Sequence, residues 1–122
     1  MRIEINIDCA DPPALARFWA EVLGATGVRG SGDPYCDLVW PPGSSHPPVN
    51  FQLVPEPKAA KNRLHLDLYV DDPEAEIDRI AALGATRVGG RVAGGDACAW
   101  WQVMTDPEGN EFCICAGPEN SG

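Results

Sequence analysis

The sequence has 122 residues, of which 44% are hydrophobic, so it is long enough for one domain with a hydrophobic core. Nine basic and eighteen acidic residues give a formal net charge of −9. Because this charge repels phosphate backbones and anionic membrane surfaces, it argues against nucleic-acid binding and membrane-surface binding. The sequence shows no membrane span and no signal peptide, and its five cysteines lack CxxC spacing, so we expect a cytoplasmic protein.

The first predicted element is a strand at residues 2–8, where apolar and polar side chains alternate. Asp11 and the two prolines that follow it predict the start of a helix, because an aspartate can cap free amides and proline suits the first turn. We expect this helix to run to Leu23. Gly24 can take the left-handed conformation that ends a helix.

Residues 25–50 are rich in glycine and proline, which predicts short elements joined by turns. We expect strands at residues 36–40 and 49–54, with a loop at 41–48 between them. A linker at residues 55–61 follows the second of these strands.

The same order of elements then begins again. Alternation at residues 64–69 predicts a strand, and Asp72, which precedes a proline, predicts a helix that ends at Gly84. We expect the pairs Gly89-Gly90 and Gly94-Gly95 to form turns.

The last predicted elements are strands at residues 100–104 and 111–115, separated by a strong turn signal at 106–110. The segment Leu23-Gly24-Ala25 recurs 60 residues later as Leu83-Gly84-Ala85. Two copies are too few for a repeat array, so the pattern indicates duplication inside one domain.

We therefore predict a single domain over residues 1–122, with module one at about 1–57 and module two at about 62–116. In each module we expect a curved sheet with a helix on its apolar face. The other face of each sheet is polar.

These polar faces carry the residue types that could do chemistry. If the two sheets curl toward each other, the polar side chains of their first and last strands line one cleft. Glutamate, histidine and cysteine are ligands of first-row metals, and glutamine can be one. The alternative is an ordinary sheet with one solvated face, which shows the same alternation. The polar positions on the first and last strands are Glu4, Asn6, Asp8, Gln52, His65, Asp67, Tyr69, Cys113 and Cys115.

Two further groups of side chains have two interpretations each. The tryptophans at positions 40, 100 and 101 are candidates either for a cleft wall that stacks on a planar ligand or for core packing. Lys58, Lys61 and Arg63 form a small basic cluster in an acidic protein. This cluster could bind an anionic group or could be a solvated linker.

The sequence resembles the vicinal oxygen chelate superfamily (glyoxalase/bleomycin resistance protein/dioxygenase), and within it the small glyoxalase-like proteins of bacteria. The resemblance lies in residues 11–24, 61–68, 83–85 and 106–112, which are distributed over nearly the whole chain. It implies an α+β fold of two βαβββ modules. These would form a curved, barrel-like mixed sheet around a cleft, with the helices outside.

The resemblance also implies a divalent metal (Zn, Fe, Ni or Mn) held by the first and last strands of each half. The matching positions are Glu4, Gln52, His65 and Cys113. Many members carry His where this chain has Glu4, and metal-dependent members typically carry Glu where it has Cys113. The set therefore departs from those of glyoxalase I and of the extradiol dioxygenases. The ligand cleft is predicted to include Asn6, Asp67, Tyr69 and Trp101.

Three functions fit these observations. The first is a metal-assisted lyase, isomerase or dioxygenase that acts on a small oxygen-rich substrate. The second is a metal-free protein that sequesters a ligand or an antibiotic, similar to bleomycin-resistance proteins. The third is a degenerate domain that only pairs with a partner. The resemblance implies a small-molecule ligand and a homodimer, and the sequence identifies no catalytic residue.

Overall fold

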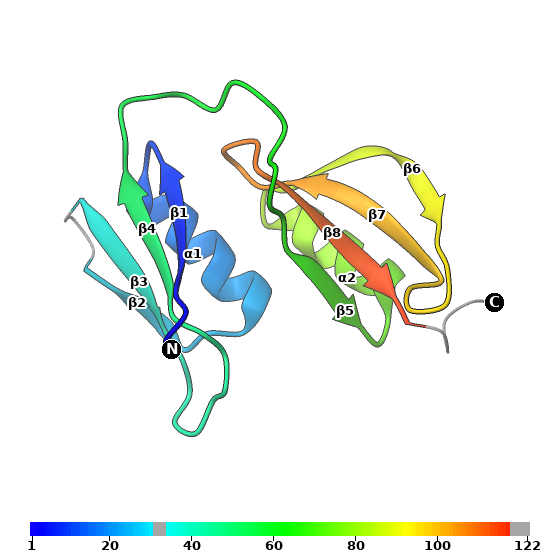
Figure 1. The fold of residues 1–122 in the computed structure, drawn as a ribbon, viewed down its shortest axis with the longest axis horizontal. Helices are drawn as coiled ribbons and strands as arrows, with labels where there is room; N and C mark the ends of the chain where they lie inside the picture. The colour runs from blue at the N-terminus through cyan, green and yellow to red at the C-terminus, as the bar shows by residue number, and fades with distance from the viewer. Residues whose placement is uncertain (31–33, 118–122) are drawn as a thin grey trace. The chain divides into compact units, whose positions relative to one another are not determined.

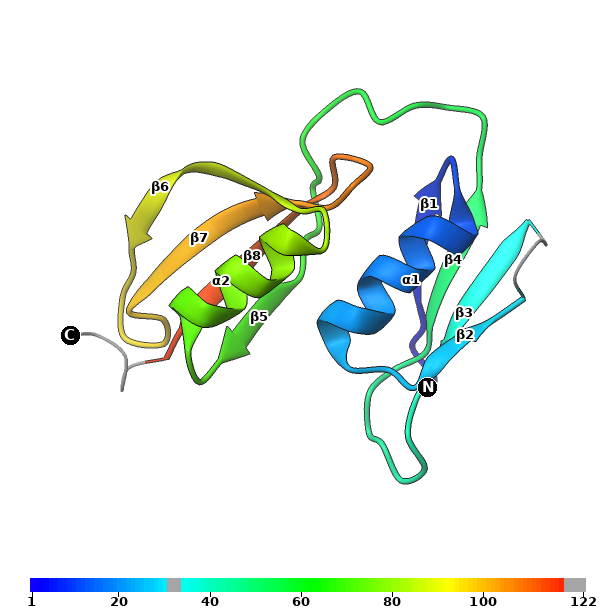
Figure 2. The same ribbon diagram turned by 180° about the vertical axis from the view of Figure 1, so that it is seen from behind.

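The structure is a computed structural model that describes residues 1–30 and 34–117 (Figure 1). The chain divides into two compact units, Met1–Pro57 and Lys58–Gly122, and each is described by itself. Each unit contains one four-stranded sheet and one helix that packs on a face of that sheet, which Figure 2 shows from behind.

Unit 1 is a βαβββ module. Its strand order is β1-β4-β3-β2; β1 runs parallel to β4, and the other neighbours are antiparallel. The sheet is therefore mixed and open, with β1 and β2 at its edges. The elements are β1 (Ile5–Cys9), α1 (Pro12–Leu23), β2 (Gly27–Arg29), β3 (Tyr35–Val39) and β4 (Val49–Leu53).

Helix α1 begins and ends where the sequence predicts. The Asp11 side chain accepts a hydrogen bond from the backbone N–H of Ala14 at 3.1 Å, and Gly24 adopts the left-handed conformation with φ of 76°. The buried face of the helix includes Leu15 and Trp19, and Phe51 of β4 is fully buried in the same unit. Burying these large apolar side chains stabilises the unit.

Unit 2 repeats the arrangement. Its strand order is β5-β8-β7-β6, with β5 parallel to β8 and the other neighbours antiparallel. The elements are β5 (Asp67–Val70), α2 (Pro73–Ala82), β6 (Thr86–Ala93), β7 (Trp100–Thr105) and β8 (Glu111–Ala116). The predicted α+β fold of two βαβββ modules is confirmed.

Strand β6 corrects one prediction. Gly89-Gly90 does not form a turn between elements but lies inside β6, where the register against β7 shifts between Val88 and Val92. Gly89 has φ of 66°, a conformation that favours glycine. The buried Gln102 side chain donates to the carbonyl oxygens of Val88 and Gly89, at 3.3 and 3.0 Å, so this irregularity keeps its hydrogen bonds.

The turn between β7 and β8 is organised by Asp106. Its buried carboxylate accepts hydrogen bonds from the backbone N–H groups of Glu108 and Asn110, both at 2.9 Å, and from the Asn110 side chain. Gly109 takes a φ of 88° in the same turn. This predicted turn is confirmed, and it fixes where β8 begins.

Within the described part of the chain, neither helix is long and apolar enough to cross a bilayer.

Helix α2 provides a test of capping with a neighbouring control. The Asp72 side chain accepts a hydrogen bond from the backbone N–H of Ala75 at 3.2 Å. We expect Asp72→Ala to lower the free energy of unfolding by about 1 kcal/mol, because it removes this cap. The exposed Asp71 makes no such bond, so Asp71→Ala should change stability by less than about 0.5 kcal/mol. Urea unfolding of both variants checks this, and equal effects would contradict it.

Candidate functional site

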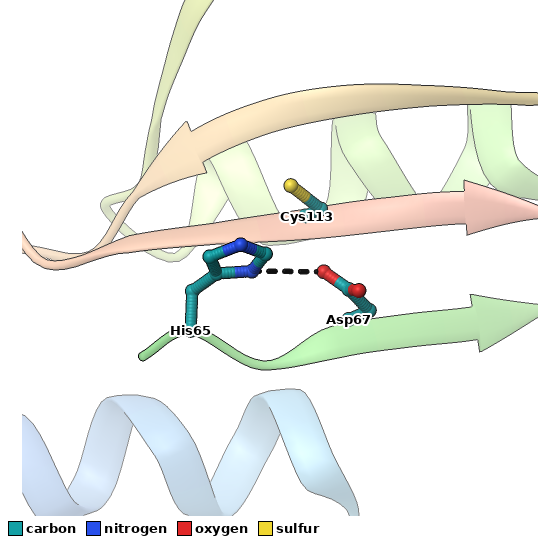
Figure 3. Close-up of side chains that lie close together, drawn as sticks. All are labelled: His65, Asp67 and Cys113. Carbon is teal, nitrogen blue, oxygen red and sulfur yellow. Dashed lines mark hydrogen bonds and ion pairs between the residues drawn. The ribbon is translucent and has the colours of Figure 1, made fainter. Parts of the chain in front are cut away.

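Three potential ligands lie together in unit 2: one on β8, one at the start of β5 and one two residues before β5 (Figure 3). They are His65, Asp67 and Cys113, and one ligand atom from each lies within 4.8 Å of the others. The His65 ring nitrogen Nδ1 lies 3.0 Å from Oδ1 of Asp67. His65 and Asp67 are exposed, whereas Cys113 is buried.

Strand pairing explains why these side chains meet. Asp67 of β5 lies directly opposite Cys113 of β8 in the parallel register. The backbone N–H of Cys113 donates to the carbonyl oxygen of Leu66 at 2.9 Å, which ties the residue between His65 and Asp67 to β8. His65 and Asp67 are two positions apart, so in extended chain their side chains point to the same side.

The same face of the sheet lines a pocket of about 430 Å³. Two cross-strand rows supply most of its wall. The first row runs from Asp67 through Cys113 to Val103, and the second runs from Tyr69 through Cys115 to Trp101. Because alternate residues point to one face, this wall follows from strand register alone.

The two buried thiols in this wall are protonated at neutral pH. Burial raises the pKa of the Cys113 thiol to about 11, and the negative charge of Asp67 adds to this effect. Burial also raises the pKa of Cys115 to about 12, with a further contribution from a hydrogen bond to Cys98. A protonated thiol is a poor nucleophile. A metal that binds Cys113 must displace the proton.

Sequence reasoning missed one carboxylate in this pocket, that of Glu111. It lies two residues before Cys113 on β8, and therefore on the same side, and it lines the pocket. It accepts a hydrogen bond from the backbone N–H of Asn62 at 2.9 Å and pairs with Lys58 at 3.1 Å. The hydrogen bond from Asn62 is the main reason that the pKa of Glu111 falls to about 2. The alternation along β8 could have identified this residue.

The predicted site residues of unit 1 form hydrogen bonds within that unit. Glu4 accepts from the Asn50 side chain at 2.8 Å and from Arg2 at 3.1 Å, and these two bonds lower the pKa of its carboxyl. The Asn6 side chain donates to the Gln52 oxygen at 2.9 Å. Each proposed ligand of this unit thus has a protein partner. Carboxylate and amide oxygens have further lone pairs with which to bind an ion.

The structure brings some of the predicted residues together within each unit. His65 and Cys113 meet in unit 2, and Asp67, predicted only as a cleft residue, joins them as a third potential ligand. The predicted cleft residues Tyr69 and Trp101 line the unit 2 pocket, and Asn6 lines a hollow of about 240 Å³ in unit 1. A common site that combines Glu4 and Gln52 with His65 and Cys113 stays a prediction.

The neighbouring tryptophans of β7 have different surroundings. Trp101 lines the pocket, whereas Trp100 is buried and its ring lies 3.7 Å from the guanidinium carbon of Arg91. Trp40 makes a ring contact with His46 at 4.6 Å in unit 1, and its indole N–H donates to the carbonyl of Pro47 at 3.1 Å.

Comparison with known proteins places the fold. The glyoxalase-like domain family matches residues 4–115. A glyoxalase/bleomycin resistance protein/dioxygenase family enzyme from Burkholderia phytofirmans PsJN aligns with a TM-score of 0.72 and 21% identity, over 93% of this chain and 96% of that one. A glyoxalase-related enzyme from Fulvimarina pelagi aligns with a TM-score of 0.70 and 16% identity, over 97% of this chain and 88% of that one. The oxidase ChaP-H2 aligns with a TM-score of 0.66 and 20% identity, over 100% of this chain and 97% of that one. No curated protein matches the sequence.

Replacing Glu111 tests its role as an anchor. Glu111→Gln keeps an acceptor for the Asn62 amide but removes the charge that pairs with Lys58. We expect it to lower the free energy of unfolding at pH 7 by about 1 kcal/mol. Because folding lowers the pKa of Glu111 from 4.5 to about 2, this difference is complete above pH 4.5 and shrinks as the pH falls toward 2.

Denaturant unfolding of metal-free protein between pH 7 and pH 3 measures that difference. The exposed Glu56, replaced by Gln, is the control and should have no effect. A Glu111→Gln deficit that is absent at pH 7, or that is unchanged at pH 3, would show that the carboxylate does not stabilise the fold through its charge.

Proposed function

Because this chain belongs to the glyoxalase-like domain family of the vicinal oxygen chelate superfamily, we propose that it is a metal-assisted enzyme for a small oxygen-rich substrate. The reaction class is that of a lyase, isomerase or dioxygenase. One observation carries the proposal: His65, Asp67 and Cys113 present three different ligand atoms within 4.8 Å of one another at the wall of a pocket.

The donor set fits a divalent metal. An imidazole nitrogen, a carboxylate oxygen and a thiolate sulfur together suit zinc, and the sulfur disfavours manganese. Metal–ligand bonds of about 2.0–2.3 Å hold neighbouring ligand atoms of a tetrahedral site roughly 3.3–3.8 Å apart. His65 and Asp67 are exposed, so their side chains have room for the small movements that this spacing requires.

Each residue then has a distinct task. His65, Asp67 and Cys113 would each supply one ligand atom, and the contact of 3.0 Å between Nδ1 of His65 and Oδ1 of Asp67 keeps these two side chains together. A bound divalent metal would polarise the oxygens of a substrate. Tyr69 and Trp101 would hold the body of that substrate through their rings. Glu111, which is held ionised by Asn62 and Lys58, is better suited to shaping the pocket than to taking up a proton.

The protonated thiol of Cys113 favours a second function, metal-free sequestration of a ligand. Cys113, with a pKa raised to about 11, keeps its proton at neutral pH unless a metal displaces it. A metal-free pocket with Tyr69 and Trp101 in its wall, in a protein of net charge −9, would suit the sequestration of a cationic aromatic ligand. The homodimer and the cytoplasmic location stay predictions.

The chain has two histidines, so His46 can serve as the control for the assignment of His65 as a metal ligand. We expect protein purified without a histidine tag to retain about one equivalent of a divalent metal, and His65→Ala to lose it. His46→Ala should retain the metal, since His46 lies in a loop of unit 1 where it contacts Trp40. Elemental analysis of the three proteins for Zn, Fe, Ni and Mn is the measurement.

Equal metal content in the wild type and in His65→Ala would remove His65 from the set of ligands. No metal in the wild type, together with no thermal stabilisation on adding Zn²⁺, would favour the sequestration function instead. Unfolding curves of both histidine variants separate loss of metal from loss of fold.

A further inference from the structure

Two basic side chains beside the pocket form no ion pair among the described residues. Six of the nine basic side chains form ion pairs within the described part of the chain. Lys61 and Arg63 form none there, although acidic residues outnumber basic ones two to one.

These two residues line a hollow of their own. It measures about 440 Å³ and is lined by residues 60–63 and His65. Lys61 and His65 also line the 430 Å³ pocket that contains Cys113, so the two cavities share part of their walls. A ligand held at Lys61 and Arg63 is therefore adjacent to the proposed metal ligands.

The backbone of this segment is held in place by contacts with Glu111. The Asn62 N–H donates to the Glu111 carboxylate at 2.9 Å, and the Asn62 side chain donates to the Glu111 carbonyl oxygen at 3.4 Å. Lys58 pairs with the same carboxylate and also donates to the carbonyl of Ala60. The positive charge of Lys58 thus balances the negative charge of Glu111. The positive charges of Lys61 and Arg63 can therefore bind an anionic group of a ligand.

We propose that Lys61 and Arg63 bind an anionic group, a carboxylate or a phosphoryl group, of the substrate whose other oxygens reach His65 and Cys113. An arginine can grip such a group with two parallel hydrogen bonds, and a lysine adds a compact positive charge. The inference rests on the proposed function and adds a substrate class to it: small oxygen-rich acids or phosphate esters. It also opposes the expectation, drawn from net charge alone, of a cationic ligand.

Titration of metal-free protein with inorganic phosphate and with acetate tests the anion site independently of the metal. At constant ionic strength set with chloride, we expect one of the two anions to give saturable shifts of the 60–65 backbone amides in two-dimensional NMR spectra. Saturation by phosphate indicates a phosphoryl group, and saturation by acetate indicates a carboxylate. The Lys61→Gln/Arg63→Gln double variant should bind that anion at least ten-fold more weakly.

Arg17→Gln is the matched control, because Arg17 is the third basic residue without an ion pair among the described residues and lies on α1 of unit 1. It should bind the anion like the wild type. Shifts that do not saturate, that chloride reproduces, or that persist in the double variant would overturn the proposal. Each single variant serves as a substitute if the double variant does not give a folded spectrum.

Metal analysis of the same variants separates the two proposals. The Lys61→Gln/Arg63→Gln variant should lose the anion shifts and retain the metal, whereas His65→Ala should lose the metal. Loss of metal in the double variant would contradict the assignment of Lys61 and Arg63 to an anion site separate from the metal ligands.

Discussion

The parallel pairing of β5 with β8 is the constraint on which the site depends. It sets Asp67 opposite Cys113 and Tyr69 opposite Cys115, and β7 extends both rows to Val103 and Trp101. The helix covers the other face of the sheet and buries its apolar residues there, so the polar and soft side chains gather on the face that lines the pocket. A shift of one residue in this pairing would turn every one of these side chains to the opposite face. The register of the strands thus determines which side chains line the pocket.

Glu111 connects this face with the segment that precedes β5. Its carboxylate binds Asn62 and Lys58, and this holds residues 58–65 against the start of β8. Lys58 balances the negative charge of Glu111, so the remaining polar groups at the pocket fall into a basic region and a region of potential metal ligands. Lys61 and Arg63 supply positive charge at one end, and the three potential metal ligands His65, Asp67 and Cys113 lie beside it. A substrate with an anionic end and a second pair of oxygens would match this arrangement.

Much of the fold could be predicted from local sequence, because its signals are local. Asp11 and Asp72 cap their helices, Gly24 ends the first, and the Asp106 turn precedes the last strand. Alternation also placed His65 and Cys113 on polar strand faces, and the family resemblance named them as metal-ligand positions. Local signals could not show that Gly89 lies in a bulge, since that depends on Gln102 reaching across from β7. Nor could they show that Asp67 lies close to Cys113 or that Glu111 binds the linker, because both contacts depend on pairing between segments about 50 residues apart. The short strand β2 carries three residues and no periodic pattern, so local sequence did not place it, although the βαβββ modules implied by the resemblance include it.

X-ray absorption spectroscopy at the zinc edge is the most direct test of the claim that Cys113 and His65 hold a metal. For zinc-loaded wild-type protein, the account predicts one sulfur at about 2.3 Å and nitrogen or oxygen ligands at about 2.0–2.2 Å. The sulfur contribution should disappear in Cys113→Ser and persist in Cys98→Ser, since only Cys113 lies with His65 and Asp67 among the described residues. A first shell with nitrogen and oxygen alone, or a sulfur contribution that survives in Cys113→Ser, would contradict it.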